Sequence, residues 1–169
     1  VRAILGLDEA PHDAIDPAAL ADLIARDAAQ VIDLDSTDNY AEAHLRGAYW
    51  ALRAGLGAAL DKLPEGEGPI VLTSTDGVLA TFAAAEAAAL TTRPVRVLAG
   101  GMDAWRAAGR ALESGPGRTL SPPDDRWLLA DERPGGERLN VTGYIDWETS
   151  LFSVIEGDGD APYRNLLWG

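Results

Sequence analysis

Short apolar runs alternate with helical patterns over much of the sequence. Apolar runs with the length of buried strands lie at residues 31–35, 70–72 and 95–98, and residues 44–50 predict a turn into a further strand. Strands that are apolar on both faces are typical of a parallel sheet with helices on each side. The pattern therefore predicts an α/β fold.

Helices are predicted between these strands. The first begins after Asp16, whose side chain can cap the helix, and has Pro17 at its first position, where a missing N–H costs nothing. Residues 36–43 predict a polar turn that leads into a short helix carrying Tyr40, and further helices are predicted at residues 52–63, 80–90 and 102–108.

Residues 69–90 organise the predicted fold, because strand, tight loop and helix follow one another there without a break. The loop holds Ser74, Thr75, Asp76, Gly77, Val78 and Leu79. In a parallel sheet, ligands bind beyond the carboxyl ends of the strands, where loop amides and a helix N-terminus attract anions. We therefore place the candidate site in this loop. Gly77 meets a backbone requirement, since a tight loop needs a residue that tolerates positive φ.

The C-terminal part of the sequence is organised differently. Residues 114–123 are rich in Gly and Pro and predict a linker. Beyond them, a helix at about residues 140–156 has a broad apolar face made of Val141, Tyr144, Ile145, Trp147, Leu151, Phe152, Val154 and Ile155. An extension of this size cannot form a core alone, so we expect it to dock on the first domain or on a second copy of the chain. A homodimer through the helix from Val141 to Ile155 is one such arrangement.

The pattern predicts four segments along the chain. Residues 1–13 are a lead-in, 14–113 the α/β domain, 114–123 the linker, and 124–169 an extension with one amphipathic helix. The chain begins at Val1 rather than Met, which we interpret as a sign of processing or of a fragment of a longer protein.

Composition narrows the possible functions. The net charge of −13 disfavours nucleic acid as a partner. The absence of cysteine excludes disulfides, thiolate metal ligands and thiol catalysis. With His12 and His44 as the only imidazoles, we expect no metal and no cofactor, and we interpret His44 as a turn organiser. No apolar run approaches the roughly 20 residues of a membrane helix and no signal-peptide pattern is present, so we expect a cytoplasmic protein without membrane contact.

Several blocks of the sequence occur in an order and spacing that resemble a known family. They are Val31-Ile-Asp-Leu34 followed by Tyr40, His44-Leu-Arg-Gly-Ala48, Pro69-Ile-Val-Leu72, and Val95-Arg-Val-Leu-Ala-Gly-Gly-Met-Asp-Ala-Trp105. Over about residues 15–113 the chain resembles the rhodanese family of sulfurtransferases. The resemblance implies a rhodanese-like parallel five-stranded sheet flanked by helices on both faces, here with a C-terminal helical extension.

The chain departs from the rhodanese pattern where the family carries out its chemistry. Rhodaneses have a catalytic Cys at the start of the loop, which takes up sulfur as a persulfide, and usually an Arg at its end that helps bind the anionic donor. The corresponding residues here are Ser74 and Leu79. An Arg that often follows the second strand is replaced by Asp35, and Asp76 adds a further negative charge. A hydroxyl cannot form a persulfide, so we expect an inactive homologue whose loop residues are degenerate and which has no catalytic residue of its own.

Three functions remain open at the level of the sequence. The first is a rhodanese-like domain with a structural, regulatory or partner-binding role. The second is part of a multi-domain thiosulfate sulfurtransferase whose activity resides in other, Cys-bearing rhodanese repeats. The extension, with Asp-Asp-x-Trp at residues 124–127, resembles the C-terminal part of such bacterial multi-rhodanese proteins. The third is an anion-binding or hydrolytic site using Ser74, although a Gly-x-Ser-x-Gly elbow is absent. The partners that we expect are other rhodanese domains of a longer parent or another protein.

Overall fold

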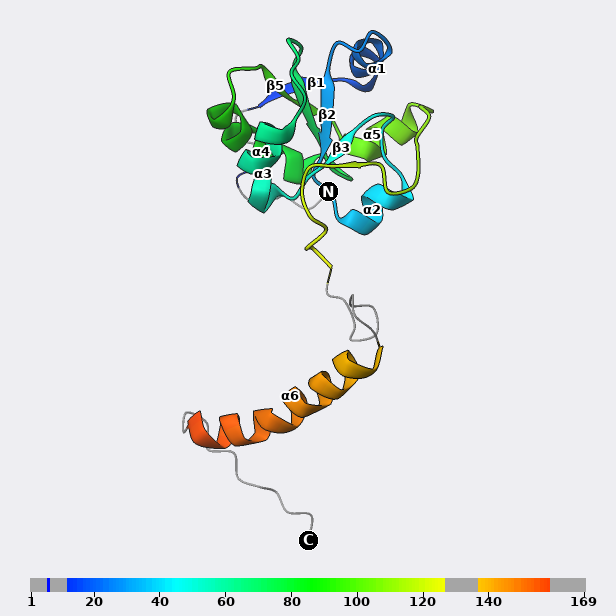
Figure 1. Ribbon diagram of the computed structural model, residues 1–169. Coiled ribbons are helices and arrows are strands. Elements are labelled where there is room, and N and C mark those ends of the chain that lie inside the picture. The colour runs from blue at the N-terminus through cyan, green and yellow to red at the C-terminus, as the bar shows by residue number, and fades with distance from the viewer. Residues whose placement is uncertain (1–5, 7–11, 127–136, 159–169) are drawn as a thin grey trace. The chain divides into compact units, whose positions relative to one another are not determined.

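The computed structural model describes residues 6, 12–126 and 137–158. The chain divides into two units, Val1–Asp125 and Arg126–Gly169 (Figure 1). The expected lead-in lies almost wholly outside the described residues, as does Trp127 of the expected extension. No described helix is long and apolar enough to cross a membrane.

The first unit is built on a parallel sheet of six strands in the order β1-β5-β4-β2-β3-β6 (Figure 1). The strands are β1 (Asp13–Ile15), β2 (Gln30–Asp33), β3 (Tyr49–Trp50), β4 (Ile70–Thr73), β5 (Val95–Leu98) and β6 (Arg118–Thr119). Strands β2 and β4 pair at the centre, with Asp33 opposite Thr73 at the last position of the ladder. Because all the strands are parallel, their carboxyl ends meet at one edge of the sheet.

Helices cover both faces of this sheet (Figure 1). They are α1 (Pro17–Ala25), α2 (Thr37–Glu42), the 3₁₀ turn η1 (Arg53–Gly55), α3 (Leu56–Lys62), α4 (Val78–Leu90) and α5 (Gly101–Ala107). Helices α3 and α4 pack on one face, where the buried alanines of α4 contribute small side chains to a cluster with Ile32 and Leu72. Helices α1, α2 and α5 pack on the other face around Trp50 and Leu98. Two apolar clusters thus hold the sheet between them.

The start of α1 confirms the capping expected from the sequence. The Asp16 carboxylate accepts hydrogen bonds from the backbone N–H groups of Ala18 and Ala19, at 2.9 and 3.0 Å, and Pro17 occupies the first turn. These bonds satisfy donors that have no partner within the helix.

The sheet has six strands rather than the five predicted, and its last strand lies in the segment predicted as a linker. Residues 114–123 contain β6, and Leu120 beside it is buried in the core. The Tyr40 hydroxyl holds this segment, because it accepts a hydrogen bond from Arg118 N at 3.0 Å and donates to Ala48 O at 2.7 Å. Both residues of β6 are exposed, so no apolar alternation reveals the strand. The Gly and Pro content alone suggested a linker.

The second unit contains one described helix, α6 (Glu137–Asp158). It confirms the helix predicted at about residues 140–156 and extends it at both ends. The expected docking of this helix stays a prediction.

Asp33 is a carboxyl group buried at the end of β2, with 1% of its surface exposed. Its Oδ1 accepts a hydrogen bond from Asp35 N at 3.0 Å. Burial raises the pKa of Asp33 to about 7, and the neighbouring Asp35 carboxylate adds to the increase. The folded protein therefore holds this proton more firmly than the unfolded chain does.

We predict that Asp33→Asn stabilises the protein at high pH. Because the folded pKa of Asp33 is raised, its contribution to stability is lost as the pH rises toward about 7 and stays lost above it. The amide does not titrate and keeps an acceptor for Asp35 N. In thermal melts the variant should have a higher melting temperature than the wild type at about pH 8. The difference between the two melting temperatures should be smaller at about pH 5. The exposed Asp38→Asn serves as control, and an equal difference at both pH values would contradict the prediction.

Candidate functional site

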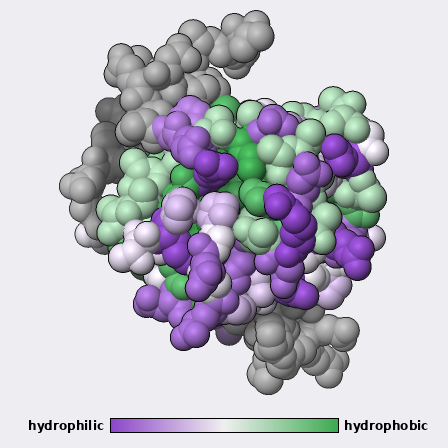
Figure 2. Space-filling model, turned by 90° about the horizontal axis from the view of Figure 1, so that it is seen from above, coloured by the Kyte–Doolittle hydropathy of each residue, from purple (hydrophilic) through white to green (hydrophobic). Residues whose placement is uncertain are grey.

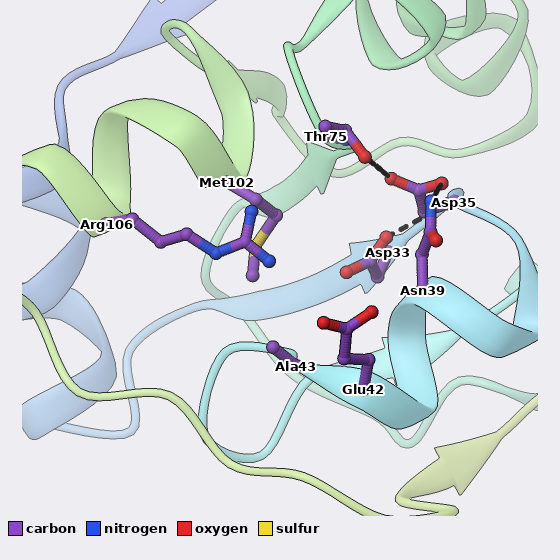
Figure 3. A pocket seen from close by; sticks show the side chains of 8 residues that line it. All are labelled: Asp33, Asp35, Asn39, Glu42, Ala43, Thr75, Met102 and Arg106. Carbon is purple, nitrogen blue, oxygen red and sulfur yellow. Dashed lines mark hydrogen bonds between the residues drawn. The ribbon is translucent and has the colours of Figure 1, made fainter.

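The candidate loop lies at the carboxyl edge of the sheet, as predicted. Strand β4 leads directly into residues 74–77, and the neighbouring strand β2 leads into Asp35. Helix α5 begins beside the same loop, after β5. Three segments distant in sequence thus meet at this edge (Figure 3).

The loop is shorter than predicted, because α4 begins at Val78. Gly77 ends the loop with φ of +81°, which confirms the expected positive φ. The Asp76 carboxylate accepts a hydrogen bond from Val78 N at 3.0 Å, and Gly77 is the N-cap residue of α4. Val78 and Leu79, predicted as loop residues, therefore form the first turn of α4.

Helix α5 holds the loop through its backbone. Met102 N donates to Ser74 O at 3.0 Å, and Asp103 N donates to Thr75 O at 2.9 Å. Gly101 has φ of +59°, and a Cβ atom there would lie 2.2 Å from Ser74 O. The second glycine of the Gly-Gly motif thus allows the N-terminus of α5 to contact the loop.

Ser74 is buried, with 3% of its surface exposed, and its Oγ accepts a weak hydrogen bond from Ala80 N at 3.4 Å. His44 is engaged elsewhere, since its Nδ1 donates to Tyr40 O at 2.7 Å and its ring stacks on Tyr40. This arrangement agrees with the interpretation of His44 as a turn organiser. Within the described residues, the hydrogen bonds of Ser74 and His44 provide no pairing of the two as nucleophile and base.

Asp35 binds the loop with its carboxylate (Figure 3). Its Oδ2 accepts hydrogen bonds from Thr75 N at 2.7 Å and from the Thr75 hydroxyl. Its Oδ1 accepts from Asn39 Nδ2 at 2.7 Å and from Ser36 N at 2.8 Å. Burial raises the pKa of Asp35, but these four hydrogen bonds outweigh it and leave the pKa below its ordinary value. Asp35 is therefore a stable anion, and its carboxylate occupies the backbone N–H of Thr75 in the loop.

A cavity of about 380 Å³ lies beside the Asp35 contact (Figure 3). It is lined by Asp33, Asp35, Asn39, Glu42, Ala43, Thr75, Met102 and Arg106. Figure 3 shows the carboxyl groups of Asp33 and Glu42 and the guanidinium of Arg106 directed into this space. Arg106 also contacts the Asp103 carboxylate, at 3.3 Å. Acidic groups thus outnumber basic ones around the cavity, which opposes the binding of an anion.

Four of the six predicted loop residues line two different cavities. Thr75 lines the first, whereas Asp76, Gly77 and Val78 line a second of about 440 Å³. Sequence reasoning missed Glu42 and Arg106, which α2 and α5 bring to the first cavity. The described residues contain no group of three His, Cys, Asp or Glu side chains that could hold a metal ion.

The chain is similar in both sequence and fold to a solved structure of an enzyme. It is a thiosulfate sulfurtransferase from Pseudomonas aeruginosa, 40% identical, with a TM-score of 0.79. The match covers 88% of this chain and 28% of that one, so the chain spans little more than a quarter of the enzyme's length.

Two more distant structures share the fold. A protein from Bacillus halodurans is 24% identical with a TM-score of 0.55, and the match covers 72% of this chain and 88% of that one. A protein of unknown function from Rhodopseudomonas palustris, a possible tyrosine phosphatase, is 22% identical with a TM-score of 0.55. That match covers 67% of this chain and 98% of the other. The comparison with curated proteins gives no significant match.

The family assignment rests on the matched segment. The model of the rhodanese-like domain matches residues 16–108, which include α1, the central strands β2 and β4, the candidate loop and α5. The 40% identity to a sulfurtransferase over most of the chain agrees with this match. The chain therefore belongs to the rhodanese-like domain family.

Proposed function

We propose that this chain is a non-catalytic rhodanese-like module with a structural or partner-binding role in a longer sulfurtransferase. The reacting cysteines would lie in other rhodanese repeats of that protein. The single observation that carries the proposal is the bond of the Asp35 carboxylate to Thr75 N, because the chain's own anion takes up a loop amide that could otherwise bind an anionic donor.

The chemistry at residue 74 supports this proposal. Persulfide formation needs a thiolate, and the chain has no cysteine. A serine hydroxyl has a far higher pKa and forms no persulfide. The buried Ser74 side chain instead accepts a hydrogen bond from Ala80 N in the first part of α4.

The charges around the loop support the proposal as well. A thiosulfate anion would meet the carboxylate of Asp35 beside the loop and that of Asp76 within it. Leu79 is apolar and lies in the first turn of α4, where a cation would help to bind an anion. Electrostatic repulsion therefore adds to the loss of the thiol.

The similarity to the Pseudomonas aeruginosa enzyme supports a longer parent protein. The match covers 88% of the chain, whereas the first unit is 125 of 169 residues, or about 74%. The similarity thus extends into the C-terminal segment. The bacterial source of this relative supports a bacterial origin, and the cytoplasm stays the expected compartment.

The first functional prediction is that the 169-residue chain has no sulfurtransferase activity. With thiosulfate and cyanide, thiocyanate formation should equal the rate in buffer, because no thiol can carry the sulfur. The Pseudomonas aeruginosa enzyme is the positive control. Thiocyanate formation that follows the purified chain through successive chromatographic steps would contradict the prediction.

The second prediction concerns the charges that accompany the missing thiol. Ser74→Cys alone should give slow turnover, whereas Ser74→Cys with Asp76→Ser and Leu79→Arg should be at least about tenfold faster, since a nearby cation lowers the thiol pKa and attracts the donor. Asp76→Ser keeps a short side chain with an oxygen that can accept the hydrogen bond from Val78 N. The thiol pKa is measured from the pH dependence of thiolate absorbance.

The matched control for this series carries Leu79→Gln in place of Leu79→Arg. The glutamine is also long and polar but uncharged, so it separates charge from size. If the single variant or the glutamine control matched the arginine variant in rate, the role assigned to charge would be wrong.

The third prediction is that Asp35→Ala frees the loop for an anion. Titration with sulfate should shift the NMR amide signal of Thr75 in this variant and leave it unchanged in the wild type, because the carboxylate no longer occupies that N–H. Asp38→Ala removes a carboxylate from the first turn of α2 and is the control for net charge. Sulfate binding of equal strength in the wild type would show that Asp35 does not block the site.

A further inference from the structure

Helix α6 exposes large apolar side chains along its length. The exposed ones are Val141, Tyr144, Ile145, Trp147, Phe152, Val154 and Ile155, and Phe152 is the most exposed at 64%. The first unit has a different surface, on which Leu90 is the only exposed large apolar residue among those described. Seen from above, polar and apolar residues are mixed on that unit (Figure 2). The apolar surface of the described chain is thus concentrated on α6.

The apolar residues of α6 occupy one half of the helix. At about 100° per residue, they and Leu151 fall within an arc of about 180°, while Asp146, Thr149 and Ser153 lie on the opposite half. From Val141 to Ile155 the face is about 21 Å long. A face this broad is wider than the narrow seam of a two-stranded coiled coil and fits a groove that contacts the helix on two sides.

The charge on α6 is wholly acidic from residue 141 onward. Residues 141–158 contain Asp146, Glu148, Glu156 and Asp158 and no lysine or arginine. Glu148 lies within the apolar arc, midway between Val141 and Ile155, each seven residues away. Its Oε1 accepts a hydrogen bond from the Tyr144 hydroxyl at 3.2 Å. A surface that buries this face must supply a partner for the Glu148 carboxylate.

A symmetric pair of α6 helices from two copies of the chain does not supply that partner. In a symmetric pair of helices, parallel or antiparallel about the middle of the face, the two Glu148 side chains would face each other in the buried seam. Like charges buried together are strongly unfavourable. The net charge of −13 on each copy adds repulsion at longer range.

We propose that the apolar face of α6 docks into an apolar groove with basic side chains at its middle and rim, on another domain of the longer sulfurtransferase. The proposal rests on the proposed function for the existence of that domain. The support for such a domain is the similarity to the Pseudomonas aeruginosa enzyme, which is 40% identical to the chain over the match. The match covers 28% of that enzyme, so 72% of its length lies outside the match. The first unit is itself acidic, with 19 carboxylates against 10 basic side chains in residues 1–125, so a basic groove is sought elsewhere.

The test uses a hybrid of the Pseudomonas aeruginosa enzyme in which this chain replaces the matched segment. Thermal melting is measured for the hybrid and for the chain alone. In the hybrid, Phe152→Asp and Glu148→Lys should each lower the melting temperature by several degrees, the first by placing a charge in the groove and the second by repelling its basic residues. Glu148→Gln should have a smaller effect than Glu148→Lys. Ser150→Asp, on the polar half of α6, should change the melting temperature by less than about one degree.

The chain alone provides the second arm, which does not depend on the folding of the hybrid. It should sediment as a monomer, and Phe152→Asp should leave its melting temperature unchanged. A dimer that Phe152→Asp dissociates would overturn the proposal in favour of a second copy. A fall in the melting temperature of the monomeric chain would overturn it in favour of packing within the chain, and binding of the chain to phosphatidylcholine vesicles would overturn it in favour of a lipid surface.

The hybrid can also overturn the proposal directly. This would happen if Phe152→Asp and Glu148→Lys changed its melting temperature no more than Ser150→Asp does. Failure of the proposed function is detected separately. It would appear as thiocyanate formation by the chain alone, whereas docking is read from melting and sedimentation, which do not depend on activity.

Discussion

The candidate site depends on the contact between the Asp35 carboxylate and Thr75. Strands β2 and β4 are neighbours in register, so the residues that follow them come within hydrogen-bond distance. A single carboxylate thereby joins the ends of the two central strands and the start of α2, through Asn39 and Ser36. A ligand anion would have to displace the Asp35 carboxylate, whose two oxygens already accept hydrogen bonds from the loop and from α2.

The central part of the fold could be predicted from the sequence because its signals are local. Strands β2, β4 and β5 are apolar runs, and α1 begins at a capping pair, Asp16 and Pro17. The two edge strands lack such signals. β1 has three residues, of which Ile15 alone is buried, and β6 has two exposed residues held by Tyr40 from a distance in sequence. A hydrogen bond between residues 40 and 118 leaves no local pattern, so the sixth strand could not be found.

The sequence predicts those residues of the candidate site that follow one another in a single continuous segment. The order of strand, loop and helix located Ser74, Thr75 and Asp76, and the departure at Asp35 was visible once the family pattern was recognised. Glu42 and Arg106 reach the cavity from α2 and α5, and their positions depend on how those helices pack. The burial of Asp33 follows from the depth of β2 in the sheet, a tertiary property that the single letter Asp does not reveal.

Gly101 contacts the loop through backbone atoms, so this contact does not depend on the chemistry of the loop's side chains. The curve of residues 74–77 is maintained by carbonyl groups that accept hydrogen bonds from the start of α5, and by glycines whose missing side chains leave room for that approach. None of these interactions involves the side chain at position 74. The contacts that hold the loop therefore do not depend on which side chain stands at position 74, so the shape of the loop and the chemistry of that residue are set separately.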